Sequence, residues 1–547
     1  MSVHLRPLIK KYFFEIILFL SFFTFACLLM WKTFRVDLEG NMQLASRLWS
    51  DFAATIPLIR SFSYGSNFPP QYPIFSGPPI RYHFVFFAVV GLLEKAGLRI
   101  DWALNSASTL AFFLLCVSIY LLGKIIFKSR TVGVISSLLF LFNGSFGFVE
   151  FFKKHPLSPN TFTDILKNTE FTSFGPYDGK IVSAFWSLNI FTNQRHLALA
   201  YAVVLFLILA IYHFSKHPDK LTWNIAFLIG LLIGLFPFIH LAGFAMLGIT
   251  LATFFVVYPK LRLKLLTAGL IAIILALPQY LYMGFSGNNT KLFAPGYLVT
   301  EKTLFGYLKY WTYNLGLTLF LAPLGFVLSK SYQRKIFLPF LILFIVGNLF
   351  QFSPEVAANH KFFNLFAIGA NLFTANFLIK LSKVKILGKL AAFSLIIPLV
   401  FTGIIDFFPI KNDRLITLVD IPNNKVANFI LKNTPKDSVF LNSSYLYNPA
   451  SLAGRKIFMG WPYFSWSAGY NTDQRQGQMQ QMFNPGKKEF LCRDLEKYNI
   501  DYVETQKPIG LEGVTVNYSF FEENFKPIFE DHVKKITIFS VEKSCKI

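Results

Sequence analysis

Residues 197–214 read LALAYAVVLFLILAIYHF, a stretch of 18 residues that contains no Asp, Glu, Lys or Arg. A bilayer core about 30 Å thick is crossed by roughly 20 mostly apolar residues in a helix, so this stretch predicts a membrane-spanning helix. Similar runs recur along the first 405 residues, and eleven are predicted, at approximately 12–31, 104–127, 132–149, 197–214, 223–240, 241–258, 265–282, 310–328, 336–350, 362–379 and 390–405. The expected fold class is a polytopic α-helical membrane protein.

The composition excludes a soluble globular enzyme. Of 547 residues, 54% are hydrophobic, and 66 Phe stand against only 29 acidic residues. Soluble domains do not use residues in this way, so lipid must cover the excess apolar surface. The sequence shows no metal-ligand spacing, no phosphate-binding glycine loop and no Ser/His/Asp arrangement, and no metal site is assigned from it.

The net charge of +23 is placed unevenly along the chain. If the N-terminus is cytoplasmic, the predicted inside segments hold eighteen Lys and Arg residues against one acid, Asp219, whereas the two short outside loops hold three basic residues. Basic residues favour the cytoplasmic side of a membrane, which supports this orientation. Eleven crossings then place the C-terminal tail outside, and the expected location is a bacterial plasma membrane.

Three outside segments are long, at about 32–103, 150–195 and from 409 onward, and function is expected there. An apolar run from Tyr82 to Leu93 lies in the first of them. It is short for a span and is followed by Glu94, so it is expected to lie in the membrane interface rather than to cross.

The tail is predicted to be a domain of its own. Helix-like stretches alternate with β-like runs, which predicts a small extracytoplasmic α/β domain over 409–547 beside a transmembrane domain over 1–408. The stretches are helix-like at 425–431, 473–482 and 488–498, and β-like at 438–441, 501–504 and 536–541. Cys492 and Cys545 share this tail, where an oxidising compartment would permit a disulfide between them.

The first outside loop holds the main candidate for chemistry. Asp37 and Glu39 follow the first apolar run, and Ser50-Asp51 opens a helix-like stretch that continues to Arg60. A carboxylate near a membrane surface is poorly solvated and holds its proton more tightly, which suits a general base near neutral pH. The alternative is that Ser50 or Asp51 caps the helix.

The stretch from Ser50 to Arg60, followed by Asn67-Phe68-Pro69-Pro70, Ser76-Gly77-Pro78-Pro79 and Arg81-Tyr82-His83, resembles the first extracytoplasmic loop of the GT-C superfamily of membrane glycosyltransferases. That superfamily includes protein O-mannosyltransferases and the aminoarabinose transferase of lipid A. In it, an acidic residue early in the loop precedes a juxtamembrane helix and serves as the catalytic base. The resemblance implies a GT-C-like fold with Asp51 as the base. The superfamily often has two adjacent acids here, whereas Phe52 follows Asp51.

The resemblance also implies a second acid from the second outside loop, and Glu150 best matches that position. Asp37 is a further acidic candidate in the first loop. A surface carboxylate at a helix end is the alternative reading of Glu150.

Basic residues at the outer face are candidates for binding the donor phosphate. The segments Asn193-Gln194-Arg195-His196 and Asn359-His360-Lys361 look like those of bacterial members of the superfamily, and basic side chains there would stabilise charge on a departing phosphate. Interfacial anchoring of the same side chains is the alternative. The candidates are Arg195, His196, His360, Lys361, Arg81, His83 and His240.

In the tail, Arg455, Trp461 and Trp466 are candidates for contact with a sugar or acceptor. Aromatic faces stack on sugars, although they also line membrane interfaces and fill small cores.

The predicted function is an inverting glycosyltransferase of hexosyl- or mannosyltransferase type. It would move a sugar from a polyprenyl-phosphate-linked donor to a glycan, lipid or protein acceptor on the extracytoplasmic side. No cofactor is predicted apart from the lipid-linked donor, a divalent metal ion stays open, and nucleic acid is not an expected partner. The alternatives are a transporter or flippase of lipid-linked intermediates and a noncatalytic scaffold.

Overall fold

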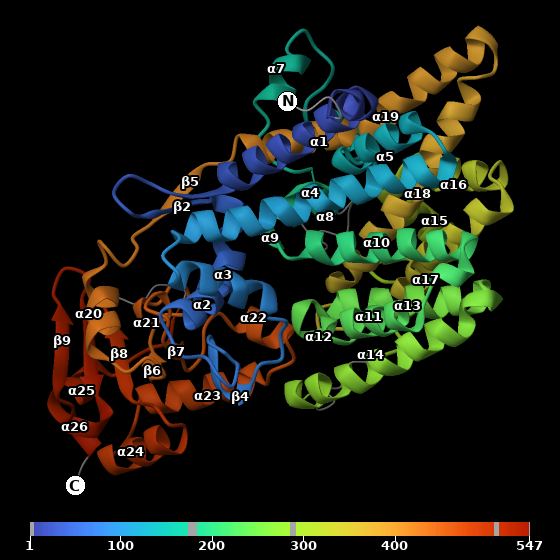
Figure 1. The fold of residues 1–547 in the computed structure, drawn as a ribbon. Coiled ribbons are helices and arrows are strands. Elements are labelled where there is room, and N and C mark those ends of the chain that lie inside the picture. The colour runs from blue at the N-terminus through green and yellow to red at the C-terminus, as the bar shows by residue number, and fades with distance from the viewer. Residues whose placement is uncertain (1–4, 173–182, 285–291, 508–512, 546–547) are drawn as a thin grey trace. The chain divides into compact units, whose positions relative to one another are not determined.

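The computed structural model describes residues 5–172, 183–284, 292–507 and 513–545 (Figure 1). The chain divides into two compact units. Unit 1 is formed by Met1–Thr33, Asn105–Ala276 and Thr290–Arg414, and unit 2 by Phe34–Leu104, Leu277–Asn289 and Leu415–Ile547.

Helices make up most of unit 1. Those lying wholly or mainly in it are α1 (Leu5–Thr33), α4 (Ile100–Phe127), α5 (Arg130–Leu141), α6 (Gly147–Lys154), α7 (Thr161–Leu166), α8 (Ser183–Trp186), α9 (Asn189–Asn193), α10 (Leu197–Lys216), η3 (Pro218–Lys220), α11 (Trp223–Gly234), α12 (Phe236–Ile239), α13 (Leu241–Val257), η4 (Pro259–Leu261), α14 (Arg262–Met283), α15 (Leu304–Leu315), α16 (Thr318–Val327), α17 (Ser331–Leu349), η5 (Val356–Asn359), α18 (His360–Leu381) and α19 (Lys385–Lys411).

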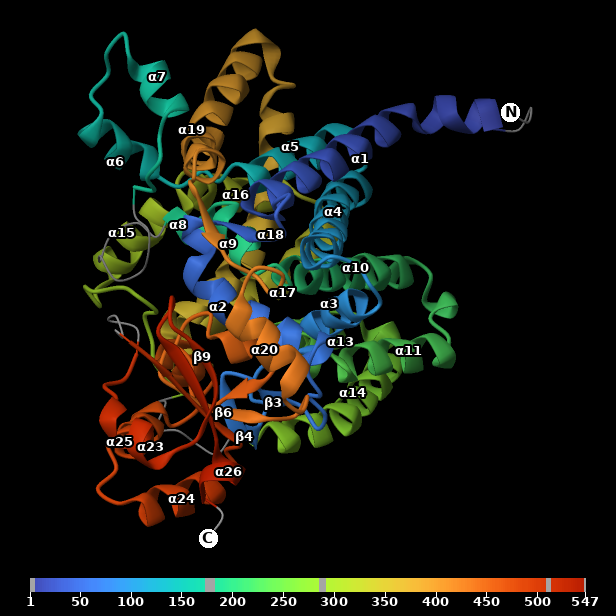
Figure 2. The same cartoon turned by 90° about the vertical axis from the view of Figure 1, so that its left-hand side faces the viewer.

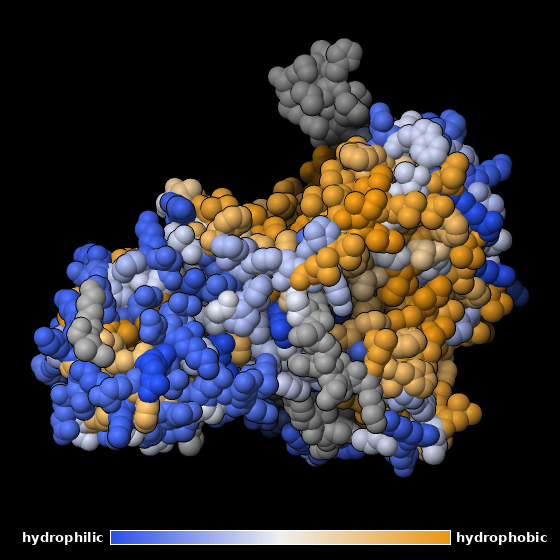
Figure 3. Space-filling model, turned by 90° about the horizontal axis from the view of Figure 1, so that it is seen from below, coloured by the Kyte–Doolittle hydropathy of each residue, from blue (hydrophilic) through white to orange (hydrophobic). Residues whose placement is uncertain are grey.

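Among the described residues, seven helices are long and apolar enough to cross a membrane. Four shorter apolar helices, at 130–141, 223–239, 241–257 and 318–327, lie at the other four predicted runs. Long apolar stripes are exposed on α14 and α19, where Ile274 is 69% and Phe393 is 69% exposed. The space-filling view likewise shows a broad hydrophobic surface on this unit (Figure 3). Soluble proteins rarely expose such patches, so unit 1 is built to be covered by lipid.

Two predicted helix boundaries are wrong. The run at 310–328 forms two helices, α15 and α16, because the chain breaks at Gly316, whose φ is +54° and whose Cβ would lie 1.8 Å from the carbonyl oxygen of Gly144. The run at 132–149 is also interrupted. Helix α5 ends at Leu141, and Glu150 belongs to the separate helix α6 rather than to the end of a span.

Unit 2 combines short strands and helices. Its first segment contains β1 (Phe34–Val36), β2 (Met42–Ala45), η1 (Ser46–Leu48), α2 (Trp49–Ser63), β3 (Gln71–Tyr72), β4 (Phe75–Pro79) and α3 (Val85–Lys95). Its last segment contains β5 (Leu415–Leu418), α20 (Lys425–Asn433), β6 (Val439–Asn442), α21 (Pro449–Leu452), β7 (Lys456–Ile457), α22 (Pro462–Ser467), α23 (Thr472–Phe483), α24 (Lys488–Lys497), β8 (Tyr502–Gln506), α25 (Tyr518–Asn524), β9 (Pro527–Asp531), β10 (Ile536–Ser540) and α26 (Val541–Cys545).

The tail forms a five-stranded sheet of order β7-β6-β8-β10-β9. Strands β6 and β9 of this sheet are labelled in Figure 2. Strand β6 runs parallel to β7 and β8, whereas β10 is antiparallel to β8 and β9. Helices α20, α23 and α24 overlap the predicted helix-like stretches. The predicted α/β character of the tail is therefore confirmed. The apolar run at 82–93 forms the 11-residue helix α3, which is too short to cross a bilayer.

Residues 34–104, most of the predicted first outside loop, fold together with the tail in unit 2. Strand β5 pairs with β2 in antiparallel register, from Met42 opposite Leu418 to Ala45 opposite Leu415, and completes the sheet β1-β2-β5. The compact units therefore differ from the predicted division at residue 408.

Cys492 of α24 and Cys545 of α26 form a disulfide. It closes the last strands of the sheet into a covalent loop.

Glu504 of β8 is a buried carboxylate. Its Oε2 accepts hydrogen bonds from the Ser443 backbone N–H at 3.0 Å and from Asn448 Nδ2 at 3.0 Å, and burial raises its pKa above the usual 4.5. The folded state thus keeps the proton at a pH where the unfolded chain has lost it. The raised pKa of Glu504 therefore stabilises the folded protein. This stabilisation is fully present at pH values below the pKa of Glu504 in the unfolded chain, and it is lost as the pH rises through the pKa of Glu504 in the folded protein.

Glu504→Gln removes this titration. The wild type loses this stabilisation as the pH is raised from about 4.5 to 8, whereas the variant does not. The melting temperature of the variant minus that of the wild type should therefore increase by roughly 2–4 °C over this pH range. Thermal unfolding in detergent, followed by intrinsic fluorescence, measures this difference. A difference between the two proteins that stays constant with pH would contradict the assignment.

Candidate functional site

Asp51 lies in the first turn of α2, in unit 2. The N-cap residue of this helix is Leu48, so neither Ser50 nor Asp51 occupies the N-cap position. The side chain of Asp51 is half-buried. The carboxylate is therefore presented at the start of the helix.

Two tyrosines surround this carboxylate. Tyr72 and Tyr82 have ring centroids 5.9 Å apart, and both interact electrostatically with Asp51. Burial raises the pKa of Tyr72 and of Tyr82, and the charge of Asp51 raises each further. Both phenols therefore stay protonated and can donate hydrogen bonds in this region.

Arg81 and His83 flank Tyr82 in the same unit. The guanidinium of Arg81 donates to the carbonyl oxygen of Gly469 and lies 5.1 Å from the ring centroid of Tyr470. The imidazole of His83 is buried and stacks on Tyr82 with ring centroids 3.9 Å apart. Unit 2 thus brings the predicted base together with two of the predicted phosphate-binding residues.

Asp37 is differently placed. It lies in the turn between β1 and β2, where its carboxylate accepts hydrogen bonds from Gln43 Nε2 at 2.7 Å and from the Asn41 backbone N–H at 2.8 Å. The Gln43 hydrogen bond, with those from the turn backbone, lowers the pKa of Asp37. This carboxylate closes a turn, and its lowered pKa makes it a weaker base.

Glu150 lies in the first turn of α6, in unit 1. Its carboxylate pairs with Lys153 Nζ at 2.6 Å, an i,i+3 contact on the helix surface.

Four of the predicted phosphate-binding residues converge in unit 1. His196 and His240 are buried with ring centroids 5.0 Å apart, and Lys361 interacts electrostatically with both and with His360. His196 is the N-cap of α10, His240 is the N-cap of α13, and His360 is the first residue of α18. Three helix N-termini therefore meet at a cluster of three imidazole groups and the ammonium of Lys361.

Hydrogen bonds hold parts of this cluster in place. Tyr201 donates to the carbonyl oxygen of Lys361 at 2.7 Å and so ties α10 to α18. The ring nitrogens of His360 lie 3.5 Å from Gln194 Nε2 and 3.3 Å from Asn364 Nδ2. The sequence pattern did not indicate either amide.

Arg195 is buried beside His196 but serves the packing of unit 1. Its guanidinium donates to Asn105 Oδ1 at 2.5 Å, Thr33 Oγ1 at 2.9 Å and the carbonyl oxygen of Thr192 at 3.0 Å. These contacts join α1, α4 and the segment before α10.

Sequence reasoning missed a cavity of about 50 Å³ in unit 1, which is lined by apolar residues and several asparagines. Asn143, Asn314, Asn364 and Asn371 are among its lining residues. Asn143 also approaches the buried Asp406 of α19, with 3.5 Å between Nδ2 and Oδ2. The sequence did carry a signal, because asparagine is unusual within apolar helices such as α18.

The tail candidates separate into internal and exposed residues. The guanidinium of Arg455 is fully buried and donates to several main-chain carbonyl oxygens, including those of Ala453 and Thr434 at 2.8 Å each, so it is used within the domain. Trp461 is the N-cap residue of α22 and is half-buried, whereas Trp466 is 39% exposed.

No protein-family model matches the chain, and no curated protein is similar to it. Among solved structures, it is similar to the archaeal oligosaccharyltransferase AglB from Archaeoglobus fulgidus in complex with an inhibitory peptide and a dolichol-phosphate, with a TM-score of 0.44 and 13% identity over 91% of this chain and 70% of that chain. The same oligosaccharyltransferase tethered to an acceptor peptide gives a TM-score of 0.44 and 13% identity, over 91% and 69% of the two chains. Its apo form gives 0.42 and 12%, over 90% and 70%.

Proposed function

We propose that this protein is an inverting glycosyltransferase that moves a sugar from a polyprenyl-phosphate-linked donor to an acceptor on the extracytoplasmic side of a membrane. The cluster of Lys361 with His196, His240 and His360 carries the proposal. Residues from three separate segments meet there, each at the N-terminus of a long helix.

Such a cluster suits a phosphate group. Helix N-termini carry partial positive charge and exposed backbone N–H groups, and both favour an anion. Imidazole N–H groups and the ammonium of Lys361 add directed donors. The cluster would bind the donor phosphate and stabilise the charge that it gains when the bond to the sugar breaks.

Asp51 is proposed as the general base. The acceptor hydroxyl or amine attacks the anomeric carbon from the face opposite the phosphate. The new bond to the acceptor forms as the carbon–oxygen bond to the phosphate breaks, the bonding electrons leave with the phosphate, and the acceptor proton passes to Asp51. The configuration at the anomeric carbon is therefore inverted.

The proposal is tested with the full chain in proteoliposomes. Radiolabelled polyprenyl-phosphate mannose and glucose are supplied in separate arms with a hydroxyl and an amine acceptor, and released polyprenyl phosphate is measured. NMR of the product then gives the anomeric configuration. Consumption of a donor with inversion is expected, whereas movement of intact donor between leaflets without cleavage would instead establish a flippase.

Lys361→Met removes the one permanent charge of the cluster. We expect kcat/KM for the lipid-linked donor to fall about 10–100-fold, because a hydrogen bond to a charged group contributes about 1.5–3 kcal/mol. Lys302→Met, at an exposed lysine of another outside loop, is the matched control and should stay within twofold. If both variants lose activity equally, general surface charge rather than the cluster binds the donor.

A further inference from the structure

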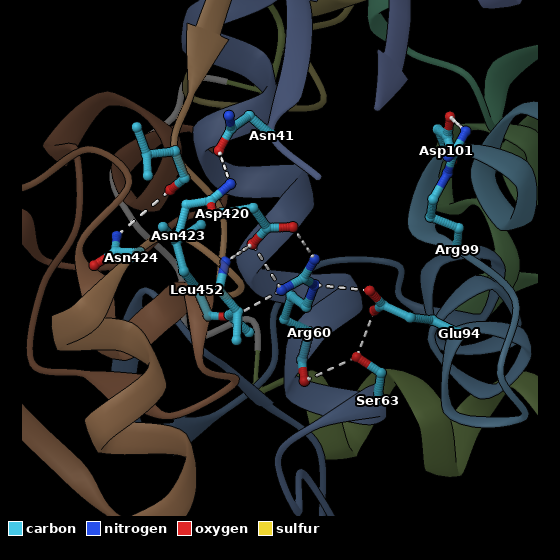
Figure 4. A network of polar contacts seen from close by, with 12 residues as sticks. Asn41, Arg60, Ser63, Glu94, Arg99, Asp101, Asp420, Asn423, Asn424 and Leu452 are labelled. Carbon is cyan, nitrogen blue, oxygen red and sulfur yellow. Dashed lines mark hydrogen bonds and ion pairs between the residues drawn. The ribbon is translucent and has the colours of Figure 1, made fainter. Parts of the chain in front are cut away.

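Arg60 occupies an unusual position at the other end of the helix that carries Asp51. It lies in the last turn of α2, its side chain is 2% exposed, and its guanidinium meets two buried carboxylates (Figure 4). Nε lies 2.9 Å from Glu94 Oε1, and Nη2 lies 2.8 Å from Asp420 Oδ2. Nη1 adds contacts of 3.2 Å to Asp420 Oδ1 and 3.2 Å to the carbonyl oxygen of Leu452.

The partners of Arg60 lie at three different elements of unit 2. Glu94 belongs to α3, Asp420 follows β5, and Leu452 ends α21. Each carboxylate is fixed in turn, since Ser63 Oγ donates to Glu94 Oε2 at 2.6 Å and the Ile421 backbone N–H donates to Asp420 Oδ1 at 2.7 Å. One planar guanidinium thus sets the position of α2 against α3 and against the tail.

Backbone packing leaves α2 little freedom around this triad. A Cβ on Gly91 of α3 would lie 2.5 Å from the carbonyl oxygen of Ile59, so the two helices touch through their backbones. At the start of α2, Tyr447 of the tail donates to the carbonyl oxygen of Trp49, and their ring centroids are 4.4 Å apart. Both ends of the helix are therefore held by residues that follow position 415.

A stabilising role alone does not account for a buried triad of this kind. Taking three charges out of water costs about as much as their attraction returns, and apolar replacements are often neutral or stabilising. An ion triad fixes a direction, which apolar contacts do not, because the N–H groups of the planar guanidinium donate to their partners in a defined geometry.

We propose that Arg60 is a positioning residue, which through Glu94 and Asp420 fixes the orientation of α2 and so the place of the Asp51 carboxylate. The two residues are nine positions apart, about 14 Å along the helix axis. A small tilt at Arg60 therefore displaces Asp51. This inference rests on the proposed function, in which Asp51 is the general base.

The test compares Arg60→Lys with Arg99→Lys in the full chain. Lysine keeps the charge but loses the fork. Arg99 is the matched control, because it also pairs with a carboxylate, at 2.7 Å from Asp101 Oδ1, but its side chain is 51% exposed. If Arg60→Lys does not fold, Glu94→Gln and Asp420→Asn take its place in the test, because each removes the charge of one partner of Arg60 with almost no change in shape.

Two measurements are made on each variant. For Arg60→Lys we expect kcat for sugar transfer to fall about 100-fold, the loss that a displacement near 1 Å produces, with the donor KM unchanged within twofold. Hydrogen exchange of the α2 backbone amides should rise at least tenfold in this variant. Neither quantity should move in Arg99→Lys.

The outcomes separate this inference from the proposed function. If the wild type consumes no donor, the proposed function fails, and hydrogen exchange still shows whether the triad fixes α2. Unchanged exchange in α2 of Arg60→Lys overturns the inference. It is also overturned if Arg60→Lys melts at a lower temperature but its folded fraction keeps the wild-type kcat, because that pattern belongs to a purely structural residue.

Discussion

Asp51→Asn is expected to reduce kcat for sugar transfer about 1000-fold, within the range that a general base contributes. The amide keeps the shape of the side chain and its place in the first turn of α2, but it cannot accept the acceptor proton. Donor binding uses other groups in the proposal, so the donor KM should stay within threefold. Single-turnover kinetics in proteoliposomes measures both quantities.

Asp37→Asn is the matched control for this experiment, because Asp37 is a second carboxylate of the same loop. Its oxygens are engaged in the turn between β1 and β2, so we expect a change in kcat below threefold. Glu150→Gln should behave alike, since Glu150 pairs with Lys153 on the helix surface. A full kcat in Asp51→Asn, or a larger loss in either control, would remove Asp51 from the role of base.

Cys545→Ser is expected to lower the free energy of unfolding of the tail by about 4 kcal/mol. The disulfide joins residues 53 positions apart, and closing a loop of that length in the unfolded chain accounts for an effect of this size. Local unfolding should begin at β9, β10 and α26, which lie within or next to the closed loop. Pulse proteolysis of the full chain in increasing urea measures the loss of unfolding free energy. Mapping of the first cleavage sites shows where unfolding begins.

Cys27→Ser is the control, since Cys27 is a free cysteine of α1 and should leave tail unfolding unchanged. Treatment of the wild type with a reductant should reproduce the effect of Cys545→Ser. An equal urea midpoint for oxidised and reduced wild type would show that the bond adds nothing to stability. Disulfides persist in oxidising compartments, so a stabilising bond also agrees with an outside tail.

Local patterns predicted the helices and strands well where a single segment decides its own structure. The helix from Trp49 to Ser63 was expected from Ser50 to Arg60, and the tail strands β6, β8 and β10 lie within one or two residues of the predicted runs. Prediction failed where a distant backbone intervenes. The helix breaks at Gly316, where the backbone of Gly144 comes close to it. The sequence of residues 310–328 does not indicate this contact with a distant residue.

The candidate site was predicted in part. His196, His360 and Lys361 were named from the resemblance of their segments to membrane glycosyltransferases, and His240 from its place between two apolar runs. The structure brings these four residues together. Their neighbours Gln194 and Asn364 were not foreseen as partners. Arg195 and Arg455 were also named as candidates for contact with a ligand, whereas both guanidinium groups are buried and bonded within their own unit.

The sequence by itself determined which segments are apolar enough to enter a membrane, because the free energy of transferring a helix from water to lipid depends on its own composition. It also placed a carboxylate at the start of a helix in the first outside loop. Only the tertiary structure decided that this loop folds with the tail and that Arg60 meets Glu94 and Asp420. Arg60 and Asp420 are 360 positions apart, and an ion pair depends on the distance between its charges in space, which the order of residues does not give.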